Sequence, residues 1–361
     1  MKCRGFFSYK TTSPAVIGGL LAVAPSVFAD TASDVAFTTE CRTMAEKAAA
    51  AKEAVVKGKD GWLFLTSELR HLGVGEFWGL AAQKASAATR EDARDPLPVI
   101  VDTAAQLKKA GVALLVVPVP PRAVIYADKL PGGEAGVPLR RDAVLQAFMA
   151  QLRSVDVAVL DLTEPFLKAR AEDEKSGPVC CRTDSHWSPR GIEIASKEIA
   201  GWLATNGVSR GELKTVVETE DVEIAGDLWR ILEDDTLPKE TVKARRVTTP
   251  DGFPLEENKD SPVLLLADSH GLVFHAGEDM LAEGGGLMDL LSAEIGGPVS
   301  LMARRGSAAT TVRIDLARRM RSEPDYIKSK VAVVWCFAAR ELTESSGWRT
   351  VPLLPEATPT E

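Results

Sequence analysis

Cysteine, histidine and asparagine are scarce in this sequence. Its 361 residues include five Cys and four His, and only two positions hold Asn. No two Cys form a Cys-x-x-Cys pattern, and no Cys lies at the spacing from a His that is typical of structural zinc sites. We therefore expect neither a metal nor another cofactor to be a permanent part of the protein.

Long apolar runs are missing beyond the first 29 residues. Residues 1–29 carry Lys2, Arg4 and Lys10 without any acid, followed by an apolar stretch that Gly and Pro interrupt. A cationic start, a short apolar region and small residues up to Ala29 are typical of a secretory signal peptide. We expect cleavage after Ala29 and export of the mature chain; the alternative is an uncut membrane anchor.

Basic residues are outnumbered by acidic ones. The chain has 43 Lys and Arg against 51 Asp and Glu, and loss of the three cations of the signal segment takes the formal net charge from −8 to −11. Such a charge disfavours nucleic acid as a partner. It also repels an anionic polymer, so binding one would require a local cluster of Arg.

Apolar segments alternate with amphipathic ones after residue 97. Buried strands are expected at 112–120, 157–162, 261–267 and 330–338, and helices at 40–56, 99–110, 145–152, 188–203, 287–295 and 308–320. The stretch 57–69, a Gly-Lys-Asp-Gly turn followed by alternating apolar residues, is typical of a strand. The alternation predicts an α/β fold with a mostly parallel sheet flanked by helices.

The domain organisation follows from composition. Hydrophobic residues make up 45% of the chain, which suffices for a sizeable core. We assign one domain to residues 30–348, with an insertion of hairpins or loops near 208–260, where charged and β-branched residues are frequent. Pro and Thr in residues 349–361 indicate a disordered tail.

The tripeptide Asp-Ser-His occurs twice. The copy at 268–270 follows an apolar strand and enters a turn, and ligands of open α/β sheets bind at the carboxyl ends of strands. Ser269 is thus placed as an exposed nucleophile, with N–H groups of the turn available to an oxyanion. The alternative is that Ser269 is only a turn residue.

The first copy lies in a polar loop ahead of a helix that Ser188 caps. In an extended loop residues i and i+2 point the same way, so Asp184 and His186 face one side together. This favours His186 as the general base and Asp184 as the group that orients it. Ser185 and His270 would then be expendable, and His71 and His275 structural or exposed. Alternatively, the two Asp-His pairs together hold a metal.

Four cysteines remain after removal of the signal segment. Adjacent cysteines rarely bond to each other without strain, so we consider a disulfide between Cys41 and either Cys180 or Cys181. Four free thiols, including Cys336, are the alternative.

Five segments together resemble a known family. They are KGKDGWLFL (57–65), VVPVPPRAVIYADKLPG (116–132), TDSHWSPRG (183–191), LLLADSHG (264–271) and VVWCFAARELTE (333–344). In this order they resemble the SGNH-hydrolase-like domain of the alginate O-acetyltransferases AlgJ and AlgX, over about residues 40–345. In that family the Asp and His precede the Ser, as they do here. No room remains for the carbohydrate-binding module of AlgX, so the outline is closer to AlgJ.

The resemblance implies a periplasmic enzyme that moves acetyl groups through an acyl-enzyme onto a secreted polysaccharide, alginate or a similar polymer. Its triad corresponds to Asp184, His186 and Ser269. The implied acetyl donor is a membrane-bound acyltransferase, and other proteins of polysaccharide biosynthesis or export are further implied partners. An acetyl-polysaccharide esterase and a non-catalytic subunit of an export complex remain alternatives.

Two departures from ordinary SGNH hydrolases affect the expected chemistry. Ala267 stands where those enzymes have Gly, and no Asn lies in a context suited to the oxyanion donor of the superfamily. We expect the amides of Ser269 and Gly306 to bind the oxyanion. Without a binding module the catalytic domain must hold the polymer, and the candidates at sheet ends are Arg122, Tyr126, Arg304, Arg305, Arg313 and Arg340.

Overall fold

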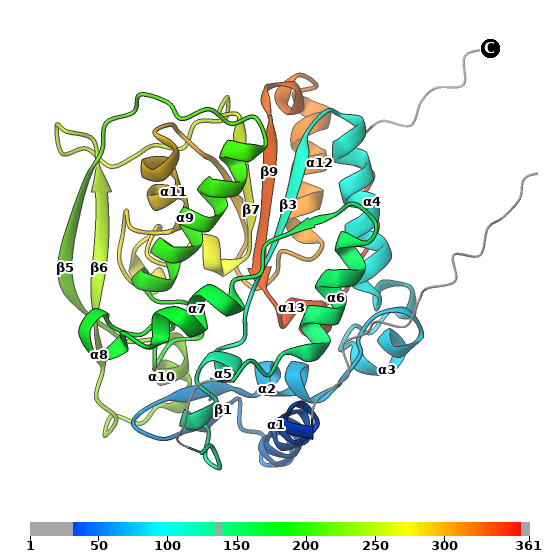
Figure 1. Ribbon diagram of the computed structural model, residues 1–361, viewed down its shortest axis with the longest axis vertical. Helices are drawn as coiled ribbons and strands as arrows, with labels where there is room; N and C mark the ends of the chain where they lie inside the picture. Colours follow the sequence, from blue (N-terminus) through cyan, green and yellow to red (C-terminus); the bar gives the residue numbers. More distant parts are fainter. Residues whose placement is uncertain (1–31, 135–138, 355–361) are drawn as a thin grey trace, which may run out of the picture.

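A five-stranded parallel sheet forms the centre of the computed structural model, which describes residues 32–134 and 139–354 (Figure 1). The strand order is β4-β3-β9-β7-β8. The strands are β3 (Ala113–Val119), β4 (Ala158–Val159), β7 (Val263–Ala267), β8 (Ser300–Ala303) and β9 (Ala332–Ala338). Every neighbouring pair is parallel, which confirms the predicted α/β class.

The side chains of each central strand divide between two cores. Along β9, Ala332, Val334 and Cys336 belong to one core, whereas Val333, Trp335 and Phe337 belong to the other. Successive residues of a strand point to opposite faces of a sheet. A strand that is covered on both faces is therefore apolar throughout, which is why the sequence revealed β7 and β9.

Helices cover both faces of the sheet. Residues of α9 (Pro189–Thr205) and α11 (Leu287–Ile295) line the first core, and α4 (Pro96–Lys109), α6 (Ala143–Arg153) and α12 (Thr311–Ser322) line the second. The two groups lie on either side of the sheet in Figure 1. Ser188 caps α9 as predicted, accepting a hydrogen bond from the Gly191 amide at 3.3 Å.

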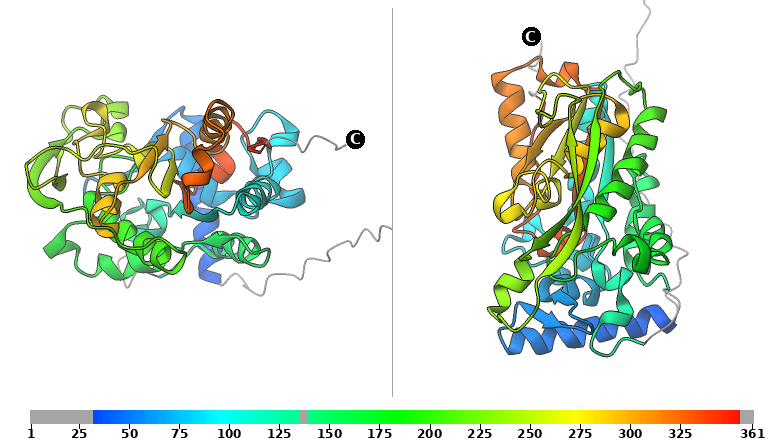
Figure 2. Two further views of the ribbon diagram at one scale, coloured as in Figure 1. Left: turned by 90° about the horizontal axis from the view of Figure 1, so that it is seen from above. Right: turned by 90° about the vertical axis from the view of Figure 1, so that its left-hand side faces the viewer.

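The insertion between α9 and β7 is β-rich, as predicted. Strands β5 (Val216–Ile224) and β6 (Glu240–Thr248) pair as an antiparallel ribbon, and α10 (Asp227–Leu232) lies between them in sequence. The ribbon forms one side of the molecule and faces the viewer in the right-hand view of Figure 2.

The N-terminal part differs from the sequence prediction. Helix α1 spans Ala32–Ala50 instead of 40–56, and the strand expected over 57–69 is the hairpin of β1 (Val55–Lys57) and β2 (Leu63–Leu65), followed directly by α2 (Thr66–Gly73). The buried residues of α2 recur at the i, i+3 and i, i+4 spacings of a helix, as Glu68 with His71 and Leu69 with Gly73, and His71 and Gly73 lie beyond the stretch 57–69.

Short helices complete the described chain. The α-helical turns are α3 (Ala82–Ala85), α5 (Arg122–Ile125), α7 (Thr163–Arg170), α8 (Asp173–Ser176) and α13 (Glu341–Glu344). The 3-10 turns are η1 (Gly79–Ala81), η2 (Glu91–Ala93), η3 (Ala127–Lys129), η4 (Ser269–Gly271), η5 (Glu278–Met280) and η6 (Tyr326–Ser329).

The disordered tail was predicted from residue 349, but the chain is still packed in the domain there. Val351 and Leu353 are buried in the second core, and the Leu353 amide donates to Gln106 Oε1 of α4 at 2.7 Å. Residues 349–354 are thus part of the domain, whereas 355–361 lie outside the described residues, as does the predicted signal segment. Within the part of the chain that is described, no helix combines the length and apolar character needed to span a bilayer.

The disulfide hypothesis is wrong for this structure. Cys41, Cys180, Cys181 and Cys336 are all free and buried. The Cys181 thiol donates to the Trp187 carbonyl oxygen at 3.5 Å, and burial raises the pKa of Cys180 to about 12. These thiols therefore behave as small apolar side chains of the core.

Candidate active site

The two Asp-Ser-His tripeptides meet at the carboxyl end of the sheet. Ser269 lies two residues beyond the end of β7, in the turn η4, and the loop that carries Asp184 and His186 leads into α9. The His186 Nε2 atom lies 2.7 Å from Ser269 Oγ, and the His186 Nδ1 atom lies 2.6 Å from Asp184 Oδ1. Ser269 retains 9% of its surface exposed. The three side chains that the sequence selected thus form one continuous hydrogen-bonded chain.

Each tripeptide builds the same local unit. Asp184 Oδ1 accepts hydrogen bonds from both the backbone N–H (3.0 Å) and Nδ1 of His186. Asp268 Oδ1 likewise accepts from the backbone N–H (2.8 Å) and Nδ1 (3.0 Å) of His270. Since Nδ1 faces a carboxylate in both copies, it carries the proton, and Nε2 is left as an acceptor. In the first copy that acceptor meets Ser269.

Electrostatics separate the two histidines. Burial lowers the pKa of His186, but the Asp184 carboxylate outweighs burial and raises that pKa above its ordinary value. For His270 burial prevails, and its pKa falls to about 4 in spite of Asp268. His270 is therefore neutral near pH 7, packed against the Trp187 ring at a centroid distance of 5.4 Å, whereas His186 can take up a proton.

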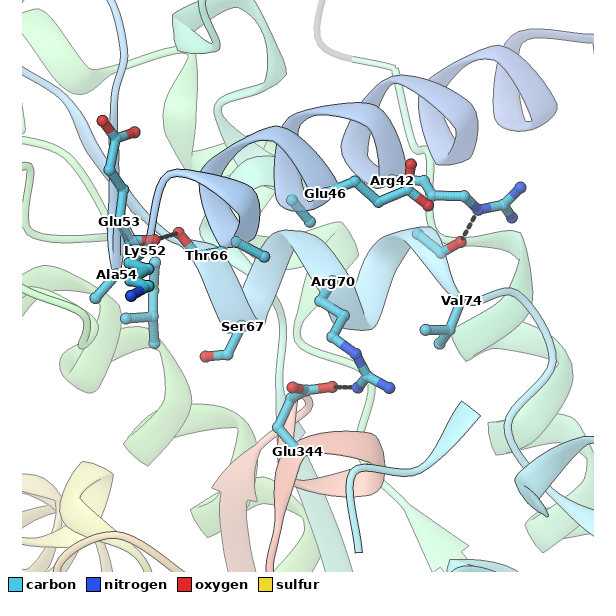
Figure 3. Close-up of a pocket in the computed structure, with 14 residues that line it drawn as sticks. Arg42, Glu46, Lys52, Glu53, Ala54, Thr66, Ser67, Arg70, Val74 and Glu344 are labelled. Carbon is cyan, nitrogen blue, oxygen red and sulfur yellow. Dashed lines mark hydrogen bonds and ion pairs between the residues drawn. The ribbon is translucent and has the colours of Figure 1, made fainter. Parts of the chain in front are cut away.

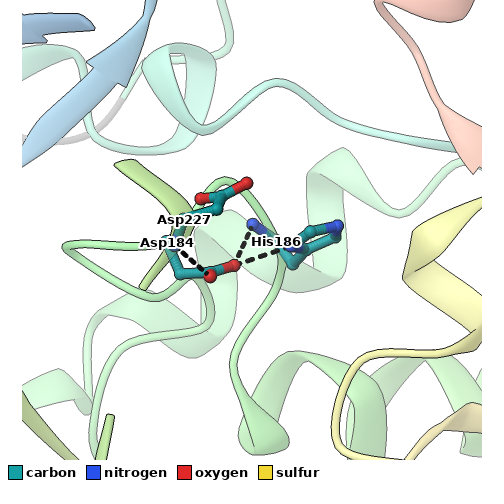
Figure 4. A group of neighbouring side chains, drawn as sticks. All are labelled: Asp184, His186 and Asp227. Carbon is teal, nitrogen blue, oxygen red and sulfur yellow. Dashed lines mark hydrogen bonds and ion pairs between the residues drawn. The ribbon is translucent and has the colours of Figure 1, made fainter. Parts of the chain in front are cut away.

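A third carboxylate, which sequence reasoning missed, lies beside the first tripeptide. Asp227, at the start of α10, accepts hydrogen bonds from the Ser185 amide at 2.6 Å and the Ser185 hydroxyl at 2.5 Å. Its own amide donates to Asp184 Oδ2 at 2.7 Å. Figure 4 shows Asp227 and Asp184 together beside His186. No local pattern ties Asp227 to residues more than 40 positions earlier.

The same cluster tests the metal alternative. Ligand atoms of Asp184, His186 and Asp227 lie within 4.8 Å of one another. However, each carboxylate oxygen of the two aspartates already accepts a hydrogen bond from an N–H or O–H group. These bonds hold the Asp-His pair in place, but Asp184 Oδ2 and both Asp227 oxygens each keep a second lone pair, so a metal stays an alternative at this cluster. Both oxygens of the Asp268 carboxylate also accept hydrogen bonds, since Oδ1 bonds His270 and Oδ2 accepts from the Ala338 amide at 2.8 Å.

Three of the predicted polymer-binding residues are buried instead, which corrects the prediction. The Arg122 guanidinium donates to the carbonyl oxygens of Leu63, Cys181 and Asp184. Tyr126 bonds Asp173 and the Val179 amide, and Arg313 bonds the carbonyls of Ala309 and Arg349. Each satisfies buried polar groups of the fold, so none is available to a polymer.

The other three predicted arginines keep some exposure. Arg304 pairs with Asp315 at 2.6 Å, and Arg305 binds Asp279 with two nitrogens, at 2.5 and 2.6 Å. The Arg340 side chain is 15% exposed and lies 3.9 Å from Glu68. Arg340 is electrostatically coupled to the site, because its positive charge is among the causes that lower the pKa of both His186 and His270.

The remaining candidates lie in other settings. Gly306 has a φ of 85° in the turn after β8, and no hydrogen bond joins it to Ser269 among the described residues; its oxyanion role stays a prediction. His71 is buried against Phe77 and bonds the Thr343 hydroxyl at 3.0 Å. His275 pairs with Asp289 at 2.9 Å.

A separate cavity of about 680 Å³ lies between α1 and α2 (Figure 3). Arg70 and Glu344 form an ion pair at its wall. Its lining includes Ala45, Ala49, Leu65 and Val74 but none of the three side chains of the hydrogen-bonded chain. This cavity is therefore distinct from the candidate active site.

A parallel α/β sheet with a Ser in the turn after a central strand, bonded to an Asp-His loop, is the layout of an SGNH-hydrolase-like domain. Comparison with known families agrees. The family model described as "SGNH hydrolase-like domain, acetyltransferase AlgX" matches residues 55–339. The chain belongs to this family.

Relatives and solved structures give the same assignment. The "Probable alginate O-acetylase AlgJ" of Pseudomonas syringae pv. tomato is 29% identical over 207 residues, 55% of this chain and 48% of the relative; that of Pseudomonas putida is 29% identical over 233 residues, 61% and 55%. The O-acetyltransferase domain of P. putida AlgJ has a TM-score of 0.59 at 22% identity, covering 80% of this chain and 92% of that one. Pseudomonas aeruginosa AlgX has a TM-score of 0.55 at 18% identity, with 83% and 66% covered. The structures establish the shared fold, and the chain spans about half the length of the curated relatives it matches.

Proposed function

We propose that the protein is an O-acetyltransferase that moves acetyl groups onto hydroxyls of a secreted polysaccharide, alginate or a similar polymer. The observation that carries the proposal is the placement of His186 between Asp184 and Ser269, at 2.6 and 2.7 Å. Membership of the AlgX family and the names of the AlgJ relatives support the acetyl group and the polysaccharide.

The first half-reaction acetylates Ser269. As Ser269 Oγ attacks the carbonyl carbon of the donor ester, its proton passes to His186 Nε2, and the Asp184 carboxylate stabilises the imidazolium that forms. The amides of Ser269 and Gly306 are the proposed donors to the oxyanion. When the carbon–oxygen bond to the leaving group breaks, His186 returns the proton to that alcohol.

The second half-reaction uses the same groups. A sugar hydroxyl gives its proton to His186 and attacks the acetyl-Ser269 carbonyl carbon, and the bond to Ser269 Oγ breaks. Ser269 recovers its proton from His186, and the sugar leaves as the acetyl ester. Neither half-reaction consumes an oxidant or a reductant.

The setting of the reaction is part of the proposal. We place the mature protein in the periplasm after export through the N-terminal signal segment, with a membrane-bound acyltransferase as the source of acetyl. Of the arginines predicted to bind the polymer, Arg340, Arg304 and Arg305 keep some exposure, and polymer carboxylates would compete for them with Glu68, Asp315 and Asp279. Other proteins of polysaccharide biosynthesis and export are further proposed partners.

The proposal is tested by following the fate of acetyl. Purified protein is incubated with a chromogenic acetyl ester, with and without oligouronate acceptor, and the products are analysed by mass spectrometry. Acetylated oligosaccharide is expected. Acetate alone at every acceptor concentration would instead identify an esterase, because water would then be the acceptor. Equal polymer acetylation in cells that carry wild type or Ser269→Ala would identify a non-catalytic subunit.

A further inference from the structure

We propose that Asp227 is a positioning residue of the active site, and that the insertion between α9 and β7 holds the Asp184–His186 loop against Ser269. This inference rests on the proposed function, since it assigns a role in the same reaction. The Asp227 carboxylate accepts hydrogen bonds from both the amide and the hydroxyl of Ser185. The Asp227 amide donates to Asp184 Oδ2, the carboxylate oxygen that does not bond His186. The Asp184 carboxylate is therefore held through both oxygens, by His186 at Oδ1 and by the Asp227 amide at Oδ2.

Residues 182–185 of the loop bond mainly to the insertion, although the Leu63 amide also donates to the Arg182 carbonyl oxygen at 2.9 Å. Glu240, the first residue of β6, accepts from the amides of Arg182 (2.7 Å) and Thr183 (3.1 Å). The Trp229 amide of α10 donates to the Thr183 carbonyl at 3.0 Å. Arg122 outside the insertion binds the Asp184 carbonyl. Buried backbone groups need such partners, and here α10 and β6 supply most of them.

The approach of the two segments depends on Gly226. A Cβ atom at this position would lie 2.2 Å from the Thr183 carbonyl oxygen and 2.7 Å from the Asp184 Cβ atom. Both contacts are far below van der Waals separation. The chain therefore reaches Asp184 closely enough for the Asp227 amide to bond it only because residue 226 has no side chain.

The charge of Asp227 adds a second effect. The groups that act on His186 are Asp184 and Asp227, which raise its pKa, and Arg340, which lowers it. The His270 ring, with its centroid 4.8 Å away, is neutral near pH 7. His186 must be neutral to accept a proton, so activity falls as the pH drops through the pKa of His186. Removing the Asp227 charge should move this acidic limb to lower pH, which a purely structural residue would not do.

The test compares Asp227→Asn with wild type in acetyl-ester turnover between pH 5 and 9. Asparagine preserves the size and one acceptor oxygen. We expect kcat to fall by about tenfold or more, KM to change little, and the acidic limb to move to lower pH. Asp221→Asn is the matched control: it neutralises an exposed acid of the same insertion, on β5, paired only with exposed Lys243, and should behave as wild type.

Reactivity toward a sulfonyl fluoride, read by mass spectrometry as modification of Ser269, separates the two proposals. Slower labelling of Asp227→Asn than of wild type supports the inference. Equal labelling rates together with unchanged kcat and pH profile would overturn it. Wild type that is neither labelled nor active would overturn the proposed function and this inference with it.

A variant that keeps the Asp227 charge covers the case in which Asp227→Asn does not fold. Ser185→Ala removes the hydroxyl donor and keeps the amide donor, so kcat should fall, though less than in Asp227→Asn, and the acidic limb should stay in place. This expectation departs from the sequence prediction that Ser185 is expendable, because the Ser185 hydroxyl bonds Asp227. Wild-type kcat in Ser185→Ala would then refute the role of this contact. If both single variants fold, their combination should cost less than the product of the two losses, because both act on one interaction.

Discussion

The imidazole rings of His186 and His270 lie with their centroids 4.8 Å apart at an angle of 61°. Each is held by the aspartate two residues before it, yet only His186 reaches a hydroxyl. The two tripeptides thus contribute unlike parts to one hydrogen-bonded chain: the first supplies the Asp-His pair and the second supplies the serine hydroxyl.

Replacing Ser269 by Ala should lower acetyl-ester turnover by about 10³-fold or more, because no other oxygen is bonded to His186 Nε2 among the described residues. Thermal stability should stay close to that of wild type, which circular dichroism would check. Ser322→Ala, at the exposed end of α12, is the control and should retain full activity. A Ser269→Ala enzyme with wild-type turnover would disprove the assignment of the nucleophile.

Arg340→Gln should move the acidic limb of the pH–rate profile to higher pH, opposite to the change expected for Asp227→Asn. The Arg340 charge opposes protonation of His186, so its removal raises the pKa of the base. The measurement is kcat/KM for an acetyl ester across the pH range, with Arg340→Lys as the variant that keeps the charge. A limb that stays in place or moves to lower pH would contradict the electrostatic link.

Arg122→Met should destabilise the protein by about 3 kcal/mol or more, because it leaves three buried carbonyl oxygens without their donor and leaves Glu68 with Arg340 as its one remaining cation among the described residues. Urea denaturation measures the loss. Arg304→Met is the control: its pair with Asp315 is at the surface, so the urea midpoint should stay that of wild type. Unchanged stability with weakened polymer binding in Arg122→Met would restore the role predicted from sequence.

Gly226→Ala should lower both stability and activity, because the new methyl group collides with the Thr183 carbonyl and pushes α10 from the Asp184 loop. Gly201→Ala, within α9 and with open space at its Cβ position, should instead stabilise the protein by about 0.4–1 kcal/mol. Thermal melts and ester turnover of the two variants provide the comparison. If the two variants had equal stability and equal turnover, the Asp184 loop would not depend on its close approach to residue 226.

His71→Gln should make the protein less sensitive to acid. Burial lowers the pKa of His71 to about 3, with help from Arg340 and Arg70. In the unfolded chain His71 takes up a proton near pH 6.5, whereas in the folded protein it does so only near pH 3. The free energy of unfolding therefore decreases as the pH falls from 6.5 toward 3. The fall in Tm between pH 6.5 and 4 should be smaller in the variant than in wild type.

His275→Gln provides a control of opposite sign. Burial lowers the pKa of His275, but the hydrogen bond to Asp289 outweighs burial and raises it. The protonated residue therefore stabilises the fold below pH 6.5, and that stabilisation is lost as the pH rises through the folded pKa. The fall in Tm between pH 6.5 and 4 should therefore be larger in His275→Gln than in wild type. A smaller fall would show that the Asp289 pair does not favour the charged form.

The sequence predicted the strands whose two faces are both covered by helices. β3, β7 and β9 are apolar throughout, so their segments were recognisable without neighbours. β8 was missed because it is four residues long and three of them are only partly buried. The first four residues of α2 were included in the predicted strand 57–69, because a stretch as short as Thr66–Gly73 contains too few turns to show helical periodicity.

The site was predictable where its geometry is local. Asp184 and His186 are two residues apart, and Ser269 lies in the turn just after a strand, so loop and strand geometry sufficed to select them. Asp227 could not be found, because its contact with Ser185 spans 42 positions. The exposure of arginines was also beyond the sequence: Arg122 and Arg313 bind carbonyl oxygens that only the folded backbone brings together.

The hydrogen bonds of the Asp184 loop have a consequence for the order in which the protein acquires activity. A chain synthesised or exported from its N-terminus presents Asp184 and His186 well before Asp227, Trp229 and Glu240, the residues that fasten this loop. Ser269 emerges later still. A partly emerged chain therefore has neither a nucleophile nor an anchored base, and reactive chemistry at Ser269 begins only when the domain is nearly complete.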